Sequence, residues 1–349
     1  MNVKLGKYKI GDNYPSLIVA ELSGNHGGNL GDALKLVKFA HKAGANAIKL
    51  QTYTANTITI NSKKKDFLIK KNSPWKNNVN YWKLYNKAHT PWGWHKKIFN
   101  LANKLGILAF SSPFDETAVD FLEKLNCPVY KLASPEINHI PLIKKIAKTK
   151  KPIIISTGLA DLKEISKAVK IIRSYKNNKI IILKCTTSYP CKNKDLNLAS
   201  MLTLKKKYKT IVGFSDHSIG DVGSITAVAL GAKMIEKHIS LKNKKTVDDF
   251  FSLNGQNFKK FVKKIRDAEM SLGSKKYKIS KSARIHMVGK RSIYVCKKIK
   301  IGDKVDKNNI KVVRPNKSLD PKFYSKLIGM ISKKNLNPGD RIKMNYFKK

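Results

Sequence analysis

The sequence is poor in acidic residues and in cysteine. It has 23 Asp and Glu against 71 Lys and Arg in 349 residues, and its formal net charge is +48. The four cysteines, Cys127, Cys185, Cys191 and Cys296, form neither a CxxC pair nor a zinc-ligand spacing. We therefore expect reduced, mostly buried thiols.

Long apolar runs are also missing. No run approaches the roughly 20 residues that a membrane-spanning helix needs, and the N-terminal segment MNVKLGKYKIGDNYP lacks the apolar region of a signal peptide. The apolar content of 42% is ordinary for a globular chain of this length. These features predict a cytoplasmic protein with no membrane partner.

The high positive charge raises nucleic acid as a partner, but the motifs that would support one are absent. The charge is nearly all lysine and is spread along every amphipathic helix, with no RNP or helix-turn-helix pattern beside it. A general lysine bias explains this better, so we expect no specific nucleic-acid partner. The positive field would still recruit an anionic substrate. A basic nucleic-acid-binding barrel remains the non-enzymatic alternative.

A GxGxxG motif is lacking as well, because residues 24–28 do not match it, which argues against a dinucleotide fold. What is present is an alternation of strand-like and helix-like segments. The expected strands are 17–22, 47–52, 108–112, 129–134, 153–157, 180–186, 210–215 and 233–239. The expected helices include 32–43, 94–104, 117–125, 140–148, 162–175, 221–230 and 258–270. Eight apolar strands with short connections predict a (β/α)8 TIM barrel.

The remaining segments set the domain organisation. Residues 58–90 include Trp75, Tyr81, Trp82 and Tyr85 among asparagines and lysines, and predict a partly helical excursion over the barrel mouth. We expect a catalytic barrel over residues 1–272, a polar basic linker over 273–288, and a small β-rich module over 289–349. An internal repeat in this module matches Gly302, Asp303 and Val305 with Gly339, Asp340 and Ile342.

Two histidines end neighbouring expected strands. His217 follows Gly213–Asp216, and His238 follows Met234–Lys237. Because the carboxyl ends of parallel strands face one way, both imidazoles can reach one small volume, which suits a divalent metal. For either histidine alone, capping of a helix or packing at a strand end is the simpler explanation. For the pair, a metal site and these structural roles are about equally well supported.

The other strand ends are also polar. Lys49 and Lys131 interrupt apolar strands, where an unpaired ammonium group would be costly to bury. Each lysine either pairs with a barrel glutamate such as Glu21 or Glu136, or joins the serine hydroxyls in a site for phosphate and carboxylate. We prefer the second interpretation, which predicts a doubly anionic small substrate.

These motifs resemble the sialic acid synthase family, and most closely its pseudaminic acid synthase branch. The resemblance covers nearly the whole chain in the family's order, through VAELSGNHGG, AIKLQTYT, FSSPFD, YKLAS, IISTG, LKCTTSYP, GFSDHS and ALGAKMIEKH. The final module resembles the antifreeze-like SAF domain of that family. The resemblance implies condensation of phosphoenolpyruvate with an amino-sugar aldehyde, with release of phosphate by C–O cleavage.

The resemblance also implies roles for individual residues. The positions matching phosphoenolpyruvate contacts are Lys49, Ser112, Lys131, Ser134, Ser156 and Ser215. His217 and His238 match the ligands of a divalent metal, Mn²⁺, Mg²⁺ or Co²⁺. The positions matching sugar contacts are Gln51, Thr187, Tyr189, Asp248 or Asp249, and Arg314. The catalytic candidates are Glu21, Glu136 and Glu236, with Glu21 or Glu236 handling the proton of the attacking water.

Two further expectations follow from the resemblance. Arg314 would reach the site of a partner subunit, which implies a homodimer with exchanged SAF domains. Thr187 replaces an asparagine typical of sialic acid synthases, and Ala133 and Pro135 replace glycines. These departures favour the pseudaminic acceptor, 2,4-diacetamido-2,4,6-trideoxy-β-L-altropyranose. A synthase for N-acetylneuraminate or legionaminic acid is the enzymatic alternative.

Overall fold

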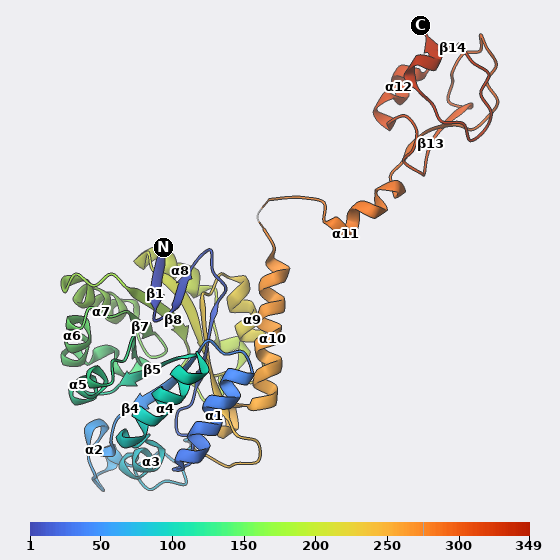
Figure 1. Cartoon of the computed structure of the whole chain (residues 1–349). Coiled ribbons are helices and arrows are strands. Elements are labelled where there is room, and N and C mark those ends of the chain that lie inside the picture. The colour runs from blue at the N-terminus through green and yellow to red at the C-terminus, as the bar shows by residue number, and fades with distance from the viewer. Residues whose placement is uncertain (275) are drawn as a thin grey trace. The chain divides into compact units, whose positions relative to one another are not determined.

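The structure is a computed structural model that describes residues 1–274 and 276–349. The chain divides into two compact units, residues 1–273 and residues 274–349. Figure 1 identifies the elements of each. The boundary between the units lies at the start of the predicted linker.

The first unit is a closed barrel of eight parallel strands, as predicted. The strands are β3 (Leu17–Glu21), β4 (Ala47–Thr52), β5 (Leu108–Pro113), β6 (Tyr130–Leu132), β7 (Ile153–Ser156), β8 (Ile180–Cys185), β9 (Ile211–Asp216) and β10 (Met234–Ser240). The barrel closes because β10 pairs in parallel with both β3 and β9. A two-residue strand, β11 (Leu253–Asn254), adds to the end of β10.

The sequence of these strands explains their burial. β7 and β8 begin with three consecutive isoleucines, and every residue of β7 is buried. Branched apolar side chains fill both faces of a parallel strand, one facing the barrel interior and one facing the helices. The predicted strand ranges agree with the observed ones except at β6, which keeps only its three central residues.

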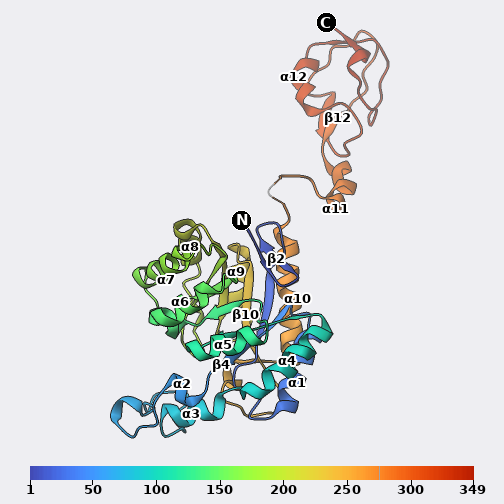
Figure 2. The same cartoon turned by 60° about the vertical axis from the view of Figure 1, so that its left-hand side comes forward.

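Helices surround the strands (Figure 2). They are α1 (Leu30–Lys42), α4 (Trp92–Leu105), α5 (Glu116–Lys124), α6 (Ile140–Lys148), α7 (Leu162–Ser174), α8 (Ser200–Tyr208), α9 (Val222–Ala229) and α10 (Gly255–Leu272). Polar side chains cap the N-termini of several of these helices. Asn29 caps α1, and Asp161 forms a capping box with Glu164 on α7. The predicted helices match within three residues. Only α8 was not predicted, because its three lysines obscure its apolar face.

Short helical turns occupy the loops at the carboxyl ends of the strands. They are η2 (Ser134–Asn138) after β6, η3 (Asn193–Asp195) after β8, and η4 (Asp249–Phe251) after β10. The excursion after β4 contains α2 (Ala55–Ile58), η1 (Lys65–Phe67) and α3 (Tyr81–Ala88). Asn80 caps α3, and the Trp82 indole donates to Asn56 Oδ1 at 2.7 Å, which joins α3 to α2.

An N-terminal hairpin was not predicted. Its strands, β1 (Asn2–Leu5) and β2 (Tyr8–Gly11), pair in antiparallel register around Gly6. Leu5 and Ile10 are fully buried in the barrel core, and Gly6 lies against Leu108 at the start of β5. The hairpin therefore packs where the strands begin, away from their carboxyl ends.

The second unit has its own small core. It contains α11 (Lys281–Arg284), η5 (Ile285–Gly289), β12 (Ser292–Val295), β13 (Ile310–Val313), η6 (Pro321–Phe323), α12 (Tyr324–Leu327), β14 (Ile331–Ser332), η7 (Met344–Tyr346) and β15 (Phe347–Lys348). The repeat appears as two matching turns. Asp303 accepts from the amide of Lys300, and Asp340 accepts from the amide of Asn337, each at 2.7 Å.

Glycine is required in both of these turns, since Gly302 and Gly339 have φ values of 89° and 92°. Val305 and Ile342, the matched apolar positions, are buried in the same core. Across both units, none of the helices among the described residues combines the length and apolarity needed to cross a bilayer.

Candidate active site

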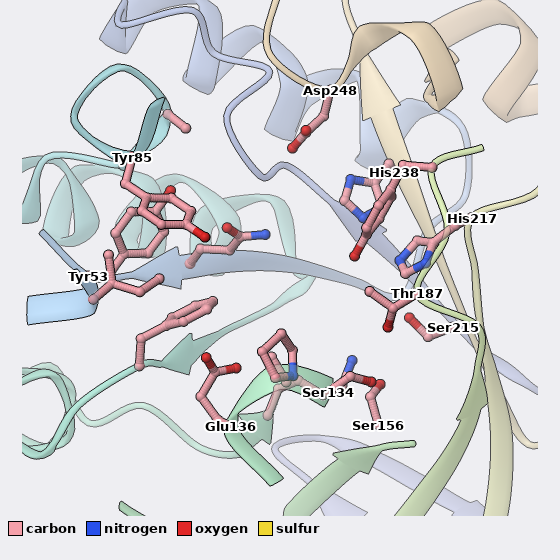
Figure 3. Close-up of a pocket in the computed structure, with 18 of the residues that line it drawn as sticks. Tyr53, Tyr85, Ser134, Glu136, Ser156, Thr187, Ser215, His217, His238 and Asp248 are labelled. Atoms are coloured by element: carbon pink, nitrogen blue, oxygen red, sulfur yellow. The ribbon is translucent and has the colours of Figure 1, made fainter. Parts of the chain in front are cut away.

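A cavity of about 440 Å³ lies at the carboxyl ends of the barrel strands. Side chains from the ends of β4 and of β6 through β10 line it, together with α3 and the loop before η4. Figure 3 shows His217, His238 and Ser215 on one side of this cavity and Tyr53 and Tyr85 on the opposite side. This end of a TIM barrel is where such enzymes carry their catalytic groups.

Most of the predicted site residues lie around this cavity. The lining includes Lys49, Gln51, Lys131, Ser134, Glu136, Ser156, Thr187, Tyr189, Ser215, His217, Glu236, His238 and Asp248. Glu21 and Ser112 lie directly behind the wall, where Gln51 Nε2 donates to Glu21 Oε1 at 2.8 Å and Lys49 Nζ donates to Ser112 Oγ at 3.3 Å. Asp249 begins η4 and is not part of the lining, and Arg314 belongs to the second unit.

The two predicted lysines share a carboxylate on the cavity floor. Lys131 Nζ donates to both oxygens of Glu236 at 2.9 and 2.8 Å. Lys49 Nζ lies 3.6 Å from Glu236 Oε1 and 3.0 Å from Glu21 Oε2. Both lysines thus pair with barrel glutamates, the interpretation that we did not prefer: Lys49 pairs with Glu21, and Lys131 pairs with Glu236 and not with Glu136. All four groups are almost fully buried.

These pairings fix the charges on the floor. Burial alone would raise the pKa of Glu236, but Lys131 and Lys49 outweigh burial and hold that pKa well below its usual range. Burial raises the pKa of Glu21, and Lys49 offsets this only in part. The Lys49 contact lacks hydrogen-bond geometry, so Glu21 Oε2 has no hydrogen-bond partner among the described residues. Glu236 is thus the permanent anion that holds the two ammonium groups in place.

Hydroxyl groups surround this charged floor. Ser215 Oγ donates to Glu236 Oε1 at 3.0 Å, and Ser134 Oγ accepts from the amide of Gly158 at 2.6 Å. Ser156 Oγ is buried and makes no hydrogen bond within the described chain. A Cβ atom on Gly158 would lie only 2.2 Å from Thr187 Oγ1, so the backbone there approaches as only glycine permits. These groups can surround a phosphate or carboxylate with donors.

The two histidines meet as predicted from their strand positions. Their ring centroids are 5.4 Å apart, and Phe251 packs against His238 at 4.7 Å. His217 Nδ1 lies 3.1 Å from the carbonyl oxygen of Thr186, which assigns the proton to Nδ1 and leaves Nε2 as an acceptor. His238 Nδ1 is buried without a partner among the described residues. Burial, reinforced by His217 and Lys49, lowers the pKa of His238 far enough to keep it neutral.

A buried ion pair lies behind the histidines. Asp216 and Lys237 precede His217 and His238 on β9 and β10, so their side chains leave the opposite face of the barrel wall. Their charged atoms are 3.0 Å apart, and both side chains are fully buried. Asp216 also accepts from Ser224 Oγ of α9 at 2.7 Å. The pair joins the two strands that carry the imidazoles.

Glu136 occupies a different environment from Glu21 and Glu236. It lies on η2, is 9% exposed, and its Oε2 has no hydrogen-bond partner in the described residues. Burial raises the pKa of Glu136 to about 7. The carboxyl can therefore exchange a proton near neutrality, as a group in contact with substrate often does.

The two candidate aspartates lie in different places. Asp248 reaches the cavity and accepts a hydrogen bond from Ser23 Oγ, whereas Asp249 turns into η4. Trp75 anchors the loop between β10 and η4, because its indole nitrogen donates to the carbonyl oxygen of Val247 at 2.9 Å.

Several lining residues were missed by sequence reasoning. They are Tyr53, Phe114, Cys185 and Val247. Tyr53 and Phe114 directly follow β4 and β5, but aromatic residues at strand ends give no signal that distinguishes a substrate wall from core. Their position immediately after predicted barrel strands was the only available signal.

The fold and the cavity define a TIM-barrel protein with a charged, hydroxyl-rich pocket at the carboxyl ends of its strands. Residues 36–277 match the NeuB family, and residues 290–347 match the SAF domain. The chain is 45% identical over 332 residues to pseudaminic acid synthase of Campylobacter jejuni, covering 95% of this chain and 96% of the relative. It is 35% identical to N,N'-diacetyllegionaminic acid synthase of C. jejuni, covering 94% of this chain and 99% of that protein.

A solved structure gives the same result. The crystal structure of N-acetylneuraminic acid synthetase from Leptospira borgpetersenii in complex with citrate has a TM-score of 0.72 and 31% identity, covering 82% of this chain and 95% of that one. The chain belongs to the NeuB family, the sialic acid synthase family that its motifs indicated. It is therefore an enzyme with sialic-acid-synthase-like activity, and the non-enzymatic alternative is wrong.

Proposed function

We propose that the protein is a pseudaminic acid synthase, which condenses phosphoenolpyruvate with 2,4-diacetamido-2,4,6-trideoxy-β-L-altropyranose to give pseudaminic acid and phosphate. The observation that carries this proposal is the floor of the cavity, where Lys49 and Lys131 converge on Glu236 beside the imidazole pair. The choice of acceptor is supported by the higher identity to the pseudaminic than to the legionaminic relative.

Phosphoenolpyruvate would bind at this floor. Lys49 and Lys131 are held within the floor by Glu236, so their ammonium groups are in place before substrate arrives. The phosphate and carboxylate would accept from these ammonium groups and from the hydroxyls of Ser134, Ser156 and Ser215. Because the donors are fixed and buried, they would also stabilise the charge on the departing phosphate without reorganising.

The residues present fit a divalent metal. His217 and His238 are close together, the carbonyl of Thr186 fixes the tautomer of His217, and an unpartnered nitrogen of His238 is available among the described atoms. No group of three or more His, Cys, Asp or Glu side chains suited to a metal occurs in residues 1–274 and 276–349. Water and substrate oxygens would therefore complete the coordination. A bound Mn²⁺, Mg²⁺ or Co²⁺ would supply Lewis-acid polarisation of the acceptor aldehyde.

The carbon–carbon bond would form between C3 of phosphoenolpyruvate and the aldehyde carbon. The electron pair of the enol double bond makes the new bond, and positive charge develops at C2. The aldehyde oxygen would take the displaced pair of its C=O bond and a proton, and so become a hydroxyl. Water would then add to C2 and lose both of its protons as the bond between C2 and the phosphate oxygen breaks, which leaves the C2 ketone and free phosphate. Glu21 is our candidate for accepting the water's proton, since its Oε2 has no hydrogen-bond partner in the described structure while Gln51 orients Oε1.

Glu236 is less suited to that proton transfer, because it is fully engaged with Lys131, Lys49 and Ser215. The acceptor sugar would occupy the rest of the cavity, facing Gln51, Thr187, Tyr189 and Asp248. Glu136, with its free oxygen, would contact the sugar or the reacting carbons.

We also propose a homodimer in which Arg314 serves the partner's site. Arg314 follows β13 and is exposed within the second unit. The segment leading to this unit exposes Tyr277 fully and Ile285 at 74%, which is unfavourable for apolar groups that remain in water. Burial of this segment against a partner protomer would remove that cost and bring a guanidinium group to the sugar.

Phosphate release from phosphoenolpyruvate in the presence of Mn²⁺ tests the proposal. The three acceptors offered in parallel are the diacetamido altrose sugar, the legionaminic precursor and N-acetylmannosamine. We expect release with the altrose sugar alone, and its loss in His217→Ala. Release with another acceptor would keep the reaction and overturn the assigned acceptor, whereas no release with any acceptor would overturn the reaction itself.

A further inference from the structure

The half of the cavity away from the charged floor is walled by aromatic rings. Tyr53 follows β4, Tyr85 lies on α3, and Phe114 follows β5. The Tyr53 ring centroid lies 5.8 Å from that of Tyr85 and 5.0 Å from that of Phe114, both in edge-on contact. We call these three residues the outer aromatic subsite. Ile58, Leu84 and Ala88 extend its apolar surface.

The outer aromatic subsite is held rigidly. Tyr53 is 3% exposed, and the indole of Trp92 donates to its carbonyl oxygen at 3.2 Å. Tyr85 stacks on Tyr81 with ring centroids 6.1 Å apart, one turn back along α3. Because these rings are fixed before any ligand binds, they can discriminate between substrates by shape and polarity.

The subsite also offers a few polar groups. Glu136 Oε2 is buried without a hydrogen-bond partner among the described residues, and the phenols of Tyr53 and Tyr85 belong to the lining of the same cavity. Burial raises the pKa of Tyr85 to about 12, so its hydroxyl stays protonated as a donor. An apolar wall with one or two donors and an acceptor matches an N-acyl group, whose methyl is apolar and whose amide needs both.

The orientation of the acceptor follows from the imidazole pair. Figure 3 places Tyr53 and Tyr85 across the cavity from His217 and His238. The aldehyde must lie near the imidazoles and the charged floor for the condensation to occur. The opposite end of the acceptor, carrying C4 to C6, is therefore directed toward the outer aromatic subsite.

We propose that Tyr53, Tyr85 and Phe114 determine acceptor specificity by binding the N-acylated C4 and the deoxygenated C6 of the sugar. This inference rests on the proposed function and names the residues that enforce it. A hydroxyl at C6 would lie against aromatic carbon without a partner, and an apolar wall of this kind discriminates against an added hydroxyl by about 100-fold. A hydroxyl at C4 in place of the acetamido group would leave the phenol hydroxyls without the acyl oxygen they would bind.

The test compares kcat/KM for two acceptors, the diacetamido trideoxy altrose sugar and N-acetylmannosamine, in the full-length enzyme. We expect the parent to prefer the first by about 100-fold. Phe114→Tyr, which adds a hydroxyl to the wall, and Tyr85→Ala, which opens it, should each reduce this preference about tenfold or more. KM for phosphoenolpyruvate should stay unchanged, because the floor is untouched.

Two controls separate the possible failures. Tyr175→Ala, at the C-terminal end of α7 and outside the cavity, should leave the preference at the parental value. Tyr85→Phe and Tyr53→Phe keep the rings and should weaken only the part of the preference that comes from an acetamido group in place of a hydroxyl at C4. If the parent turns over the altrose sugar but all wall variants keep its preference, this inference is wrong and the proposed function stands. If the parent turns over neither acceptor, both are wrong.

Discussion

At the scale of single residues, Glu136 illustrates how a buried carboxyl in the cavity wall lowers stability. Its proton is lost near pH 4.5 in an unfolded chain but only at about pH 7 in the folded barrel. Below pH 4.5 the group is neutral in both states and has no effect on the free energy of unfolding. As pH rises to 7, ionisation favours the unfolded state, and the folded state loses stability by up to about 3 kcal/mol.

We therefore predict that Glu136→Gln stabilises the barrel at pH 8 and not at pH 4. The neutral amide avoids the cost of an ionised buried carboxyl while keeping its shape. The denaturant midpoint of the barrel, followed by tryptophan fluorescence at the two pH values, measures this difference. A variant that is less stable than the parent at pH 8 would show that the carboxylate is better satisfied than its unpartnered oxygen indicates.

The sequence predicted least well which charged side chains of the site form ion pairs with one another. The sequence identified Lys49 and Lys131 as buried cations, because they interrupt apolar strands. It did not identify Glu236 as their shared partner, since every strand of the barrel ends in polar groups. Which of them meet depends on the stagger of strands that are far apart in sequence.

At the scale of elements, the strands were predicted well and the loops were not. The isoleucine-rich strands are buried on both faces, so their apolar runs mark their limits closely. The excursion after β4 was predicted only as a partly helical cover. Its α3 supplies Tyr85 to the cavity, and an alternation of aromatic, asparagine and lysine residues does not specify which ring faces inward.

The ion pair between β9 and β10 leads to a prediction about metal binding. Lys237→Met leaves Asp216 buried without its cation, which should lower stability by about 3 to 5 kcal/mol. The neighbouring imidazoles should then be less well positioned, with Mn²⁺ affinity falling about tenfold. Isothermal titration with Mn²⁺ on folded protein measures the affinity directly.

The double variant Asp216→Asn/Lys237→Met serves as the matched control, because it removes both charges together. We expect it to recover most of the lost stability while Mn²⁺ affinity stays below the parental value. If the affinity of Lys237→Met equals that of the parent, the ion pair has only a structural role.

At the scale of the whole molecule, the proposed exchange of SAF domains makes a distinctive prediction. His217→Ala removes a proposed metal ligand from the barrel, and Arg314→Ala removes the guanidinium from the second unit. Each variant alone should be nearly inactive. In a dimer formed from one of each, the intact barrel of one protomer can meet the intact arginine of the other.

Mixing the two variants after subunit exchange should restore roughly a quarter of parental activity, because half of the dimers are mixed and each has one complete site. Phosphate release before and after mixing is the measurement. No recovery, with exchange verified by a mass-tagged protomer, would mean that each Arg314 serves its own barrel or no barrel.

The closure of the barrel has a kinetic consequence. Glu21 and His238 are register partners on β3 and β10, although they come from the first and last strands of the barrel. The groups that we propose for proton transfer and metal binding therefore meet only through a contact of very high sequence separation, the kind that forms late and slowly in folding. During synthesis, the chain would carry no catalytic activity until β10 has emerged and docked. The return of turnover during refolding would therefore report when β10 pairs with β3 and closes the barrel, without the need for an optical probe.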